Sequence, residues 1–84
     1  MRFAYLYFMQ DEPDRVRAVA PQHAAYWQAI KADGYLGGPF ADRSGGLITF
    51  EASSRERAEE MTAHDPFARH GLLDRHWLKE WAIT

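Results

Sequence analysis

Two side chains in this sequence, His23 and Asp65, could together carry out proton-transfer chemistry. Asp65 lies in the run His64-Asp65-Pro66-Phe67. The proline disfavours the α conformation in the residue before it, and it is itself favoured as the first residue of a helix. Asp65 therefore lies at a corner between two helical segments, as the cap of the second. A carboxylate held at such a corner has a fixed direction and could orient the ring of a nearby histidine.

A helical pattern positions the histidine. Side chains recur at helical spacing on one stripe of the stretch 21–33, namely His23, Tyr26, Trp27 and Ile30. His23 therefore faces the sheet side, one turn from a helix start or kink expected at Pro21. We expect this start to lie near the end of the next helix. The Asp65 carboxylate would then fix the imidazole tautomer and stabilise its protonated form. The alternatives are that His23 is a satisfied core histidine and that Asp65 only caps a helix.

The sequence contains no other recognised chemical motif. It has no glycine-rich phosphate loop, no nucleophile elbow of the GxSxG type and no metal motif of recognised spacing. His64, His70 and His76 are six residues apart, which suits a chelate on neither a helix face nor a strand face. We therefore expect no metal and no cofactor. Three serines have the context of turn and cap residues, not of nucleophiles: Ser44, Ser53 and Ser54.

Composition restricts the function classes. The chain has 84 residues, no cysteine, 14% aromatic residues and a formal net charge of −2. Interspersed charges give no electrostatic footprint for nucleic acid or an anionic membrane. The apolar run from Phe3 to Met9 is too short to span a bilayer and has no cleavage pattern after it. We expect one domain over residues 1–84, soluble and cytoplasmic.

The elements that must position the pair alternate along the chain. Strands are expected over 2–9, 35–41, 47–51 and 74–83. A helical turn is expected over 15–19 and the main helix over 21–33, with a left-handed stop at Gly34. Ser53 and Glu56 form a capping box that opens the second helix, which ends at His64. A short helical turn over 66–70 is closed by Gly71. This order predicts an α+β, ferredoxin-like β-α-β-β-α-β domain, with a four-stranded antiparallel sheet and two main helices on one face.

The first strand predicts an assembly. Its side chains are apolar on both faces, with Phe3, Tyr5 and Tyr7 on one face and Ala4, Leu6 and Phe8 on the other. Both faces should therefore be covered, but the helices cover only one. We expect a homodimer that forms through the helix-free sheet face, in a dimeric α/β-barrel-type assembly.

Several short segments carry a family resemblance by their order and spacing. They are Pro21-Gln22-His23-Ala24-Ala25-Tyr26, Gly38-Pro39-Phe40, the serine-opened helix ending in Asp65-Pro66-Phe67, and Gly71-Leu72. The sequence resembles the YciI-like (YCII-related) family over nearly its whole length. The resemblance implies a dimeric ferredoxin-like fold akin to muconolactone isomerases, with a pocket whose paired His and Asp map onto His23 and Asp65. Ser44-Gly45-Gly46 lies where family members often carry a small polar or glycine-rich segment, but no role is carried over to Ser44.

The leading hypothesis is a cofactor-independent lyase or isomerase. Some members of the family are thought to act on small cyclic or chlorinated aromatic compounds. His23 would be the general acid/base and Asp65 would orient it. A pocket for a flat ring would be lined by Tyr5, Tyr7, Trp27, Gly38, Pro39 and Phe67. The alternative is a non-catalytic small-molecule-binding or accessory module of the same fold. A haem- or quinol-oxidising monooxygenase of the dimeric barrel type has no supporting motif in the sequence.

Overall fold

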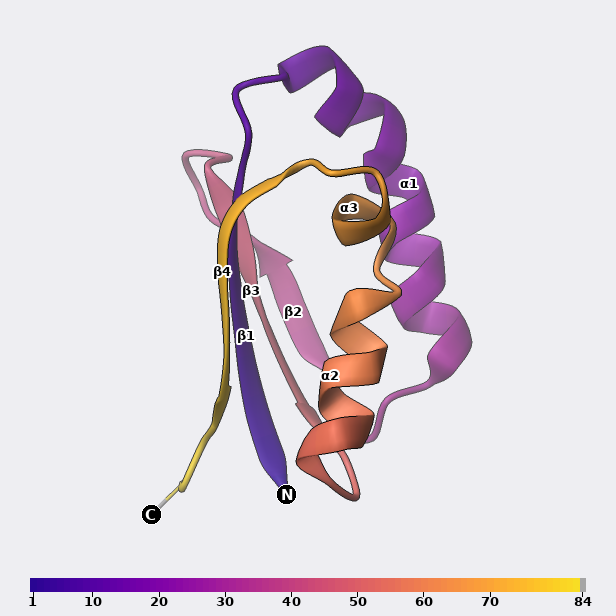
Figure 1. The fold of residues 1–84 in the computed structure, drawn as a ribbon, viewed down its shortest axis with the longest axis vertical. Coiled ribbons are helices and arrows are strands. Elements are labelled where there is room, and N and C mark those ends of the chain that lie inside the picture. The colour runs from indigo at the N-terminus through magenta and orange to yellow at the C-terminus, as the bar shows by residue number, and fades with distance from the viewer. Residues whose placement is uncertain (84) are drawn as a thin grey trace.

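The computed structural model describes residues 1–83, and its elements follow the predicted order. They are β1 (Arg2–Met9), α1 (Pro13–Ile30), β2 (Leu36–Pro39), β3 (Gly45–Glu51), α2 (Arg55–Ala63), α3 (Pro66–Arg69) and β4 (Leu73–Glu80). The strands form one antiparallel sheet in the order β2-β3-β1-β4, and the helices lie on one side of it (Figure 1). This is the ferredoxin-like arrangement, so the predicted α+β fold is confirmed.

The prediction that the main helix starts at Pro21 is wrong. Helix α1 begins at Pro13 and continues through Pro21. Proline removes one backbone donor, but Val16 and Val19 extend the apolar stripe before it, so packing stabilises both halves of the helix. The helix also ends earlier than predicted, because Lys31 takes the left-handed conformation at φ 49°.

The second helix begins one residue later than predicted. Ser54, not Ser53, is the cap of α2, and its hydroxyl accepts a hydrogen bond of 3.0 Å from the backbone N–H of Arg57. Glu56 is therefore the second residue of the helix and cannot close a capping box. Strand β2 is shorter than predicted because the chain turns from Phe40 onward, where the Phe40 N–H donates to the carbonyl of Gly45.

The core lies between the helices and one face of the sheet. Phe3, Tyr5 and Tyr7 of β1 point into it beside Phe50 of β3, and all are buried. Helix α1 contributes Trp27 to the same cluster. In this register Tyr7 lies opposite a glycine, Gly46, near the end of β1.

The other face of the sheet carries no helix within residues 1–83 (Figure 1). The register places Leu6 of β1 between Leu47 and Trp77 on this face. Leu36 is 74% exposed and Trp77 is 43% exposed. Large apolar side chains are thus presented to solvent on this face. Within residues 1–83 no helix is long and apolar enough to cross a membrane.

Candidate active site

The predicted contact between His23 and Asp65 is present. Nδ1 of His23 lies 2.8 Å from Oδ2 of Asp65 and 3.0 Å from Oδ1. Helix α1 supplies the histidine, and the start of α3 supplies the aspartate. The Asp65 side chain is 1% exposed and that of His23 is 13% exposed, so the pair is shielded from water while the ring keeps one accessible side.

The Asp65 carboxylate is held by further donors. The indole Nε1–H of Trp27 donates to Oδ2 at 2.8 Å, and the backbone N–H of Phe67 donates to Oδ1 at 2.8 Å. The second bond is the predicted helix cap, so Asp65 caps α3 and binds His23 at once. A buried carboxylate is stable only when its lone pairs are satisfied, and here both oxygens accept hydrogen bonds.

The second ring nitrogen, Nε2, lies on the opposite edge of the imidazole. A carboxylate only accepts hydrogen bonds, so Nδ1 carries a proton and the lone pair of the neutral ring is on Nε2. The hydroxyl oxygen of Tyr7 lies 3.4 Å from Nε2 and is placed to donate to it. Burial raises the pKa of the Tyr7 phenol, and the Asp65 carboxylate acts in the same direction, so this hydroxyl keeps its proton. The His23 ring stacks on Phe67, with centroids 4.4 Å apart.

A cavity of about 350 Å³ lies beside this nitrogen. Of the residues expected to line a pocket, the structure brings together His23, Tyr7, Gly38, Pro39 and Phe67. It does not place Tyr5 or Trp27 there. Trp27 is buried behind Asp65, and Tyr5 adjoins a different hollow between α2 and β4.

Other lining residues were missed by sequence reasoning: Met9, Val16, Ala20, Ala24, Tyr35, Gly37, Arg43 and Gly45. Val16, Ala20 and His23 lie one turn apart on the same stripe of α1. That signal is present in the sequence, but it is visible only when the helix is extended back to Pro13. Arg43 gives no such signal, because an exposed arginine in a turn is common.

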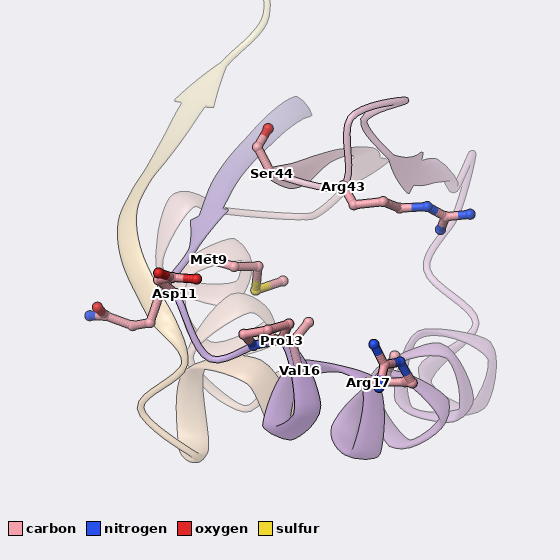
Figure 2. Close-up of a pocket in the computed structure, with 9 residues that line it drawn as sticks. Met9, Asp11, Pro13, Val16, Arg17, Arg43 and Ser44 are labelled. Atoms are coloured by element: carbon pink, nitrogen blue, oxygen red, sulfur yellow. The ribbon is translucent and has the colours of Figure 1, made fainter.

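The cavity continues outward into a second hollow of about 550 Å³. The two share Met9, Val16, Ala20 and Arg43. Figure 2 shows this outer hollow between the start of α1 and the loop that joins β2 to β3. Ser44 lies on its rim, where its hydroxyl and N–H donate to Oδ1 of Asp42 at 2.6 and 3.0 Å. These bonds hold the pKa of Asp42 below its usual value.

The remaining histidines lie outside the lining of both hollows. Nδ1 of His64 donates to the carbonyl of Glu60 at 2.8 Å, and His70 ends α3. His76 packs its ring edge against Tyr5. Within residues 1–83 no group of three or more histidine, cysteine or acidic side chains is arranged to hold a metal ion.

Comparisons with known proteins support the same fold. The sequence model of the YCII-related domain family matches residues 1–82. Among solved structures, the chain is similar to 5-chloro-2-hydroxyhydroquinone dehydrochlorinase (TftG) from Burkholderia phenoliruptrix AC1100 in complex with 2,5-dihydroxybenzoquinone. The TM-score is 0.84 at 23% identity, covering 100% of this chain and 96% of the other. It is also similar to Rv0793 from Mycobacterium tuberculosis, with TM-score 0.61, 15% identity and 99% and 95% coverage. A comparison with curated proteins finds no match.

Proposed function

Because the chain belongs to the YCII-related family, we propose that it is a cofactor-independent enzyme of the lyase or isomerase type that moves a proton on a small cyclic compound. Elimination of hydrogen halide from a halogenated hydroxy-aromatic ring is the leading reaction. The likeness to a dehydrochlorinase solved with a benzoquinone supports this choice. His23 is the general acid/base, and Asp65 orients its ring.

The bond between buried Asp65 and Nδ1 of His23 is the observation that carries the proposal. It fixes the tautomer whose lone pair is on Nε2, where a ring hydroxyl of the substrate can take the place of the Tyr7 hydroxyl, and it stabilises the imidazolium that forms. A cavity of about 150 Å³ can hold benzene, so about 350 Å³ beside His23 suits one substituted ring. The stacked Phe67 ring supplies an apolar wall for that ring.

The reaction balances without an oxidant. Nε2 of His23 takes a proton from a ring hydroxyl and returns it to the carbon that bears the halogen, which gives a ring-ketone tautomer. Loss of a second hydroxyl proton to Nε2 then forms a new C=O bond as the halide leaves with the electron pair of its bond to carbon. The net change is loss of hydrogen halide, and His23 passes its proton to solvent. The Tyr7 hydroxyl, 3.4 Å from Nε2, is placed to hydrogen-bond a ring oxygen.

The proposal includes a second copy of the chain. The homodimer expected from the strand pattern would cover the helix-free face, where Leu36, Leu47 and Trp77 are exposed. Contiguous exposed apolar side chains of this kind are typical of interaction surfaces. The His23 cavity lies on the other side of the sheet, between the sheet and α1. In a dimer paired through the helix-free face, all residues that line one cavity would therefore come from the same copy.

Halide release tests the reaction. The purified chain is incubated without oxygen or added cofactor with chlorinated hydroquinones, beginning with 5-chloro-2-hydroxyhydroquinone. We expect chloride and quinone to appear in equal amounts. His23→Asn should lower kcat by about 10²- to 10⁴-fold, because a positioned general base contributes that much.

His76→Asn is the matched control, since it makes the same change at an exposed histidine outside the cavity lining. It should keep native turnover. Native turnover by a folded His23→Asn variant would contradict the assignment of the base. Tight binding of these rings by the native chain without any turnover would favour the non-catalytic binding module.

A further inference from the structure

Within residues 1–83, Arg43 is a cation without a hydrogen-bonding or ion-pair partner for its guanidinium, at the mouth of the His23 cavity. Most arginines of the chain are engaged in ion pairs or in bonds to carbonyl groups: Arg2, Arg15, Arg17, Arg55, Arg57 and Arg75. The Arg43 guanidinium makes no hydrogen bond or ion pair with residues 1–83. Arg69 shares this property but lies exposed on α3. Arg43 differs because it lines both the inner and the outer hollow.

The backbone at Arg43 is held in an unfavourable conformation. Its φ is 65°, in the left-handed region that favours glycine or asparagine. The Arg43 N–H donates to the carbonyl of Phe40 at 2.9 Å, and the next carbonyl, that of Ser44, accepts from the N–H of Met9 at 2.8 Å. The loop is therefore fixed to the end of β1 beside the cavity. The Arg43 side chain therefore starts from a fixed point at the edge of the cavity.

The cations that line the outer hollow lie together on one side of it. Arg17 of α1 lies on the same side as Arg43 in Figure 2, across from Asp11. Arg17 is paired with Asp14 at 3.0 Å on the exposed surface. Asp42 precedes Arg43, but its Oδ1 is occupied by the hydroxyl and N–H of Ser44. Arg43 is thus the guanidinium available to a ligand.

We propose that Arg43 binds an anionic substituent of the ligand, so that the preferred substrates of the His23 site are small rings that carry a carboxylate. This inference rests on the proposed function, because it places the ring beside His23. The inner hollow of about 350 Å³ takes the ring, and the adjoining hollow of about 550 Å³ takes the substituent. A guanidinium binds a carboxylate through two parallel hydrogen bonds, which fixes the orientation of the ring as well.

Equilibrium binding of two matched ligands tests this. Calorimetry compares 2,5-dihydroxybenzoate with 2,5-dihydroxybenzamide, which have the same ring and differ in charge. The native chain should bind the carboxylate about tenfold or more tightly than the amide, and added salt should reduce the preference. Arg43→Asn should abolish the preference, and asparagine suits the left-handed backbone, so the variant should fold.

Lys31→Asn is the matched control. It removes a cation from the same backbone conformation, at φ 49°, outside the lining of both hollows. It should leave the preference unchanged. His23→Asn should also retain the preference, which separates this inference from the proton-transfer proposal. The role of Arg43 would be overturned by equal affinity for the two ligands, by binding of neither, or by an undiminished preference in Arg43→Asn. Each of these results could occur in a chain that turns over neutral rings, so this inference can fail while the proposed function stands.

Discussion

Asp65 combines the cap of α3 with the proposed orientation of His23 at one buried carboxylate. It accepts hydrogen bonds from three groups: the His23 ring, the Trp27 indole and the Phe67 N–H. We expect Asp65→Asn to destabilise the fold by about 2–4 kcal/mol, because an amide has one acceptor oxygen and turns its NH₂ group toward a donor. Turnover should fall by about 10²-fold or more as His23 loses its fixed tautomer. Guanidinium unfolding and halide release measure the two effects.

A surface aspartate separates these effects from a general loss of charge. Asp14 pairs with Arg17 at 3.0 Å, but its side chain is 94% exposed. Asp14→Asn should change the free energy of unfolding by less than about 0.5 kcal/mol. An Asp65→Asn variant as stable as Asp14→Asn would show that the buried network contributes little.

The buried phenols make stability sensitive to alkaline pH. Burial raises the pKa of Tyr5 and of Tyr7, and the Asp65 carboxylate adds to both shifts. The folded state then holds these protons more tightly than the unfolded chain, where tyrosine titrates near pH 10. The two phenols therefore add to the free energy of unfolding. This stabilisation is fully present below about pH 10 and is lost as pH rises above it, because the unfolded chain releases its protons first. Unfolding midpoints from pH 8 to 11, with absorbance at 295 nm, measure this loss.

A single substitution isolates one of these phenols. Tyr7→Phe should flatten the alkaline loss of stability, since phenylalanine has no proton to release. Full tyrosinate absorbance near pH 10 in the still-folded native chain would contradict the buried environment of the two rings.

At the residue level, the sequence predicts the contact between His23 and Asp65 but not all of its surroundings. Pro66 restricts Asp65, and helical spacing directs His23 inward, so both features are local. The Trp27 side chain was expected in the pocket, yet its indole N–H reaches Asp65 from behind. The direction of the indole depends on which acceptor lies within reach of its N–H in the folded chain. This is a property of the tertiary structure, not of the local sequence. The position of Arg43 beside a cavity likewise depends on how distant elements pack, so local sequence does not predict it.

The boundaries of the elements depend on more than local signals. Ser53 and Ser54 have the same capping chemistry, and the structure uses the second. Which serine caps the helix depends on where the chain leaves β3. The N–H of Ala52 is already bound to the carbonyl of Met1. Pro21 is a helix breaker by propensity, but packing on both sides of it keeps α1 continuous. Because the helix was predicted to start at Pro21, Val16 and Ala20 were not included in the predicted pocket.

A glycine in β3 makes room for the Tyr7 hydroxyl. A Cβ added at Gly46 would meet the Oη and Cζ atoms of Tyr7, its partner in the sheet register, and would also lie 2.8 Å from the backbone carbonyl oxygen of Gly38. Gly46→Ala should therefore push the Tyr7 hydroxyl away from Nε2 of His23. We expect a loss of about 1–3 kcal/mol in the free energy of unfolding from overpacking, and a lower kcat. Unfolding curves and steady-state turnover measure these changes.

The neighbouring edge strand offers the control. A Cβ added at Gly38 would meet nothing within 4 Å. Gly38 pairs with Leu47, so its Cβ would point to the helix-free face and away from Tyr7. Gly38→Ala should keep native stability and turnover. Equal effects of the two substitutions would show that Gly46 acts through strand propensity alone.

For the whole molecule, the order of elements is the most informative signal. Four strands interrupted by two main helices in the order β-α-β-β-α-β admit few compact topologies, because each crossover must return its helix to the same face. Strand β1 carries apolar side chains on both faces, so each face of the sheet is expected to be covered. One face is buried under the helices, and the other remains open in one copy. What covers the open face is a property of the assembly, because the contacts of one copy end at this face.

The open face gives the last prediction, which concerns the whole molecule. Leu6, Leu47 and Trp77 adjoin one another across three strands on this face, and the charged side chains of Arg75 and Lys79 flank them along β4. An exposed apolar cluster with a polar rim is typical of an interaction surface. We expect the native chain to sediment at twice its 9.7 kDa mass at micromolar concentration. Leu47 lies beside Leu6 on this face and is 38% exposed, so Leu47→Glu should bury an uncompensated charge on pairing and give a monomer.

The same charge placed on the solvent side of α1 controls for nonspecific effects. Ala29 is exposed, and Ala29→Glu should leave the sedimenting mass at that of the pair. A native chain that sediments as a monomer would remove the dimer from the proposal. A folded, monomeric Leu47→Glu variant that still binds the dihydroxybenzoate probe would show that the His23 cavity is complete within one copy. Loss of that binding together with pairing, with folding intact, would show that the second copy supports the cavity from the far side of the sheet.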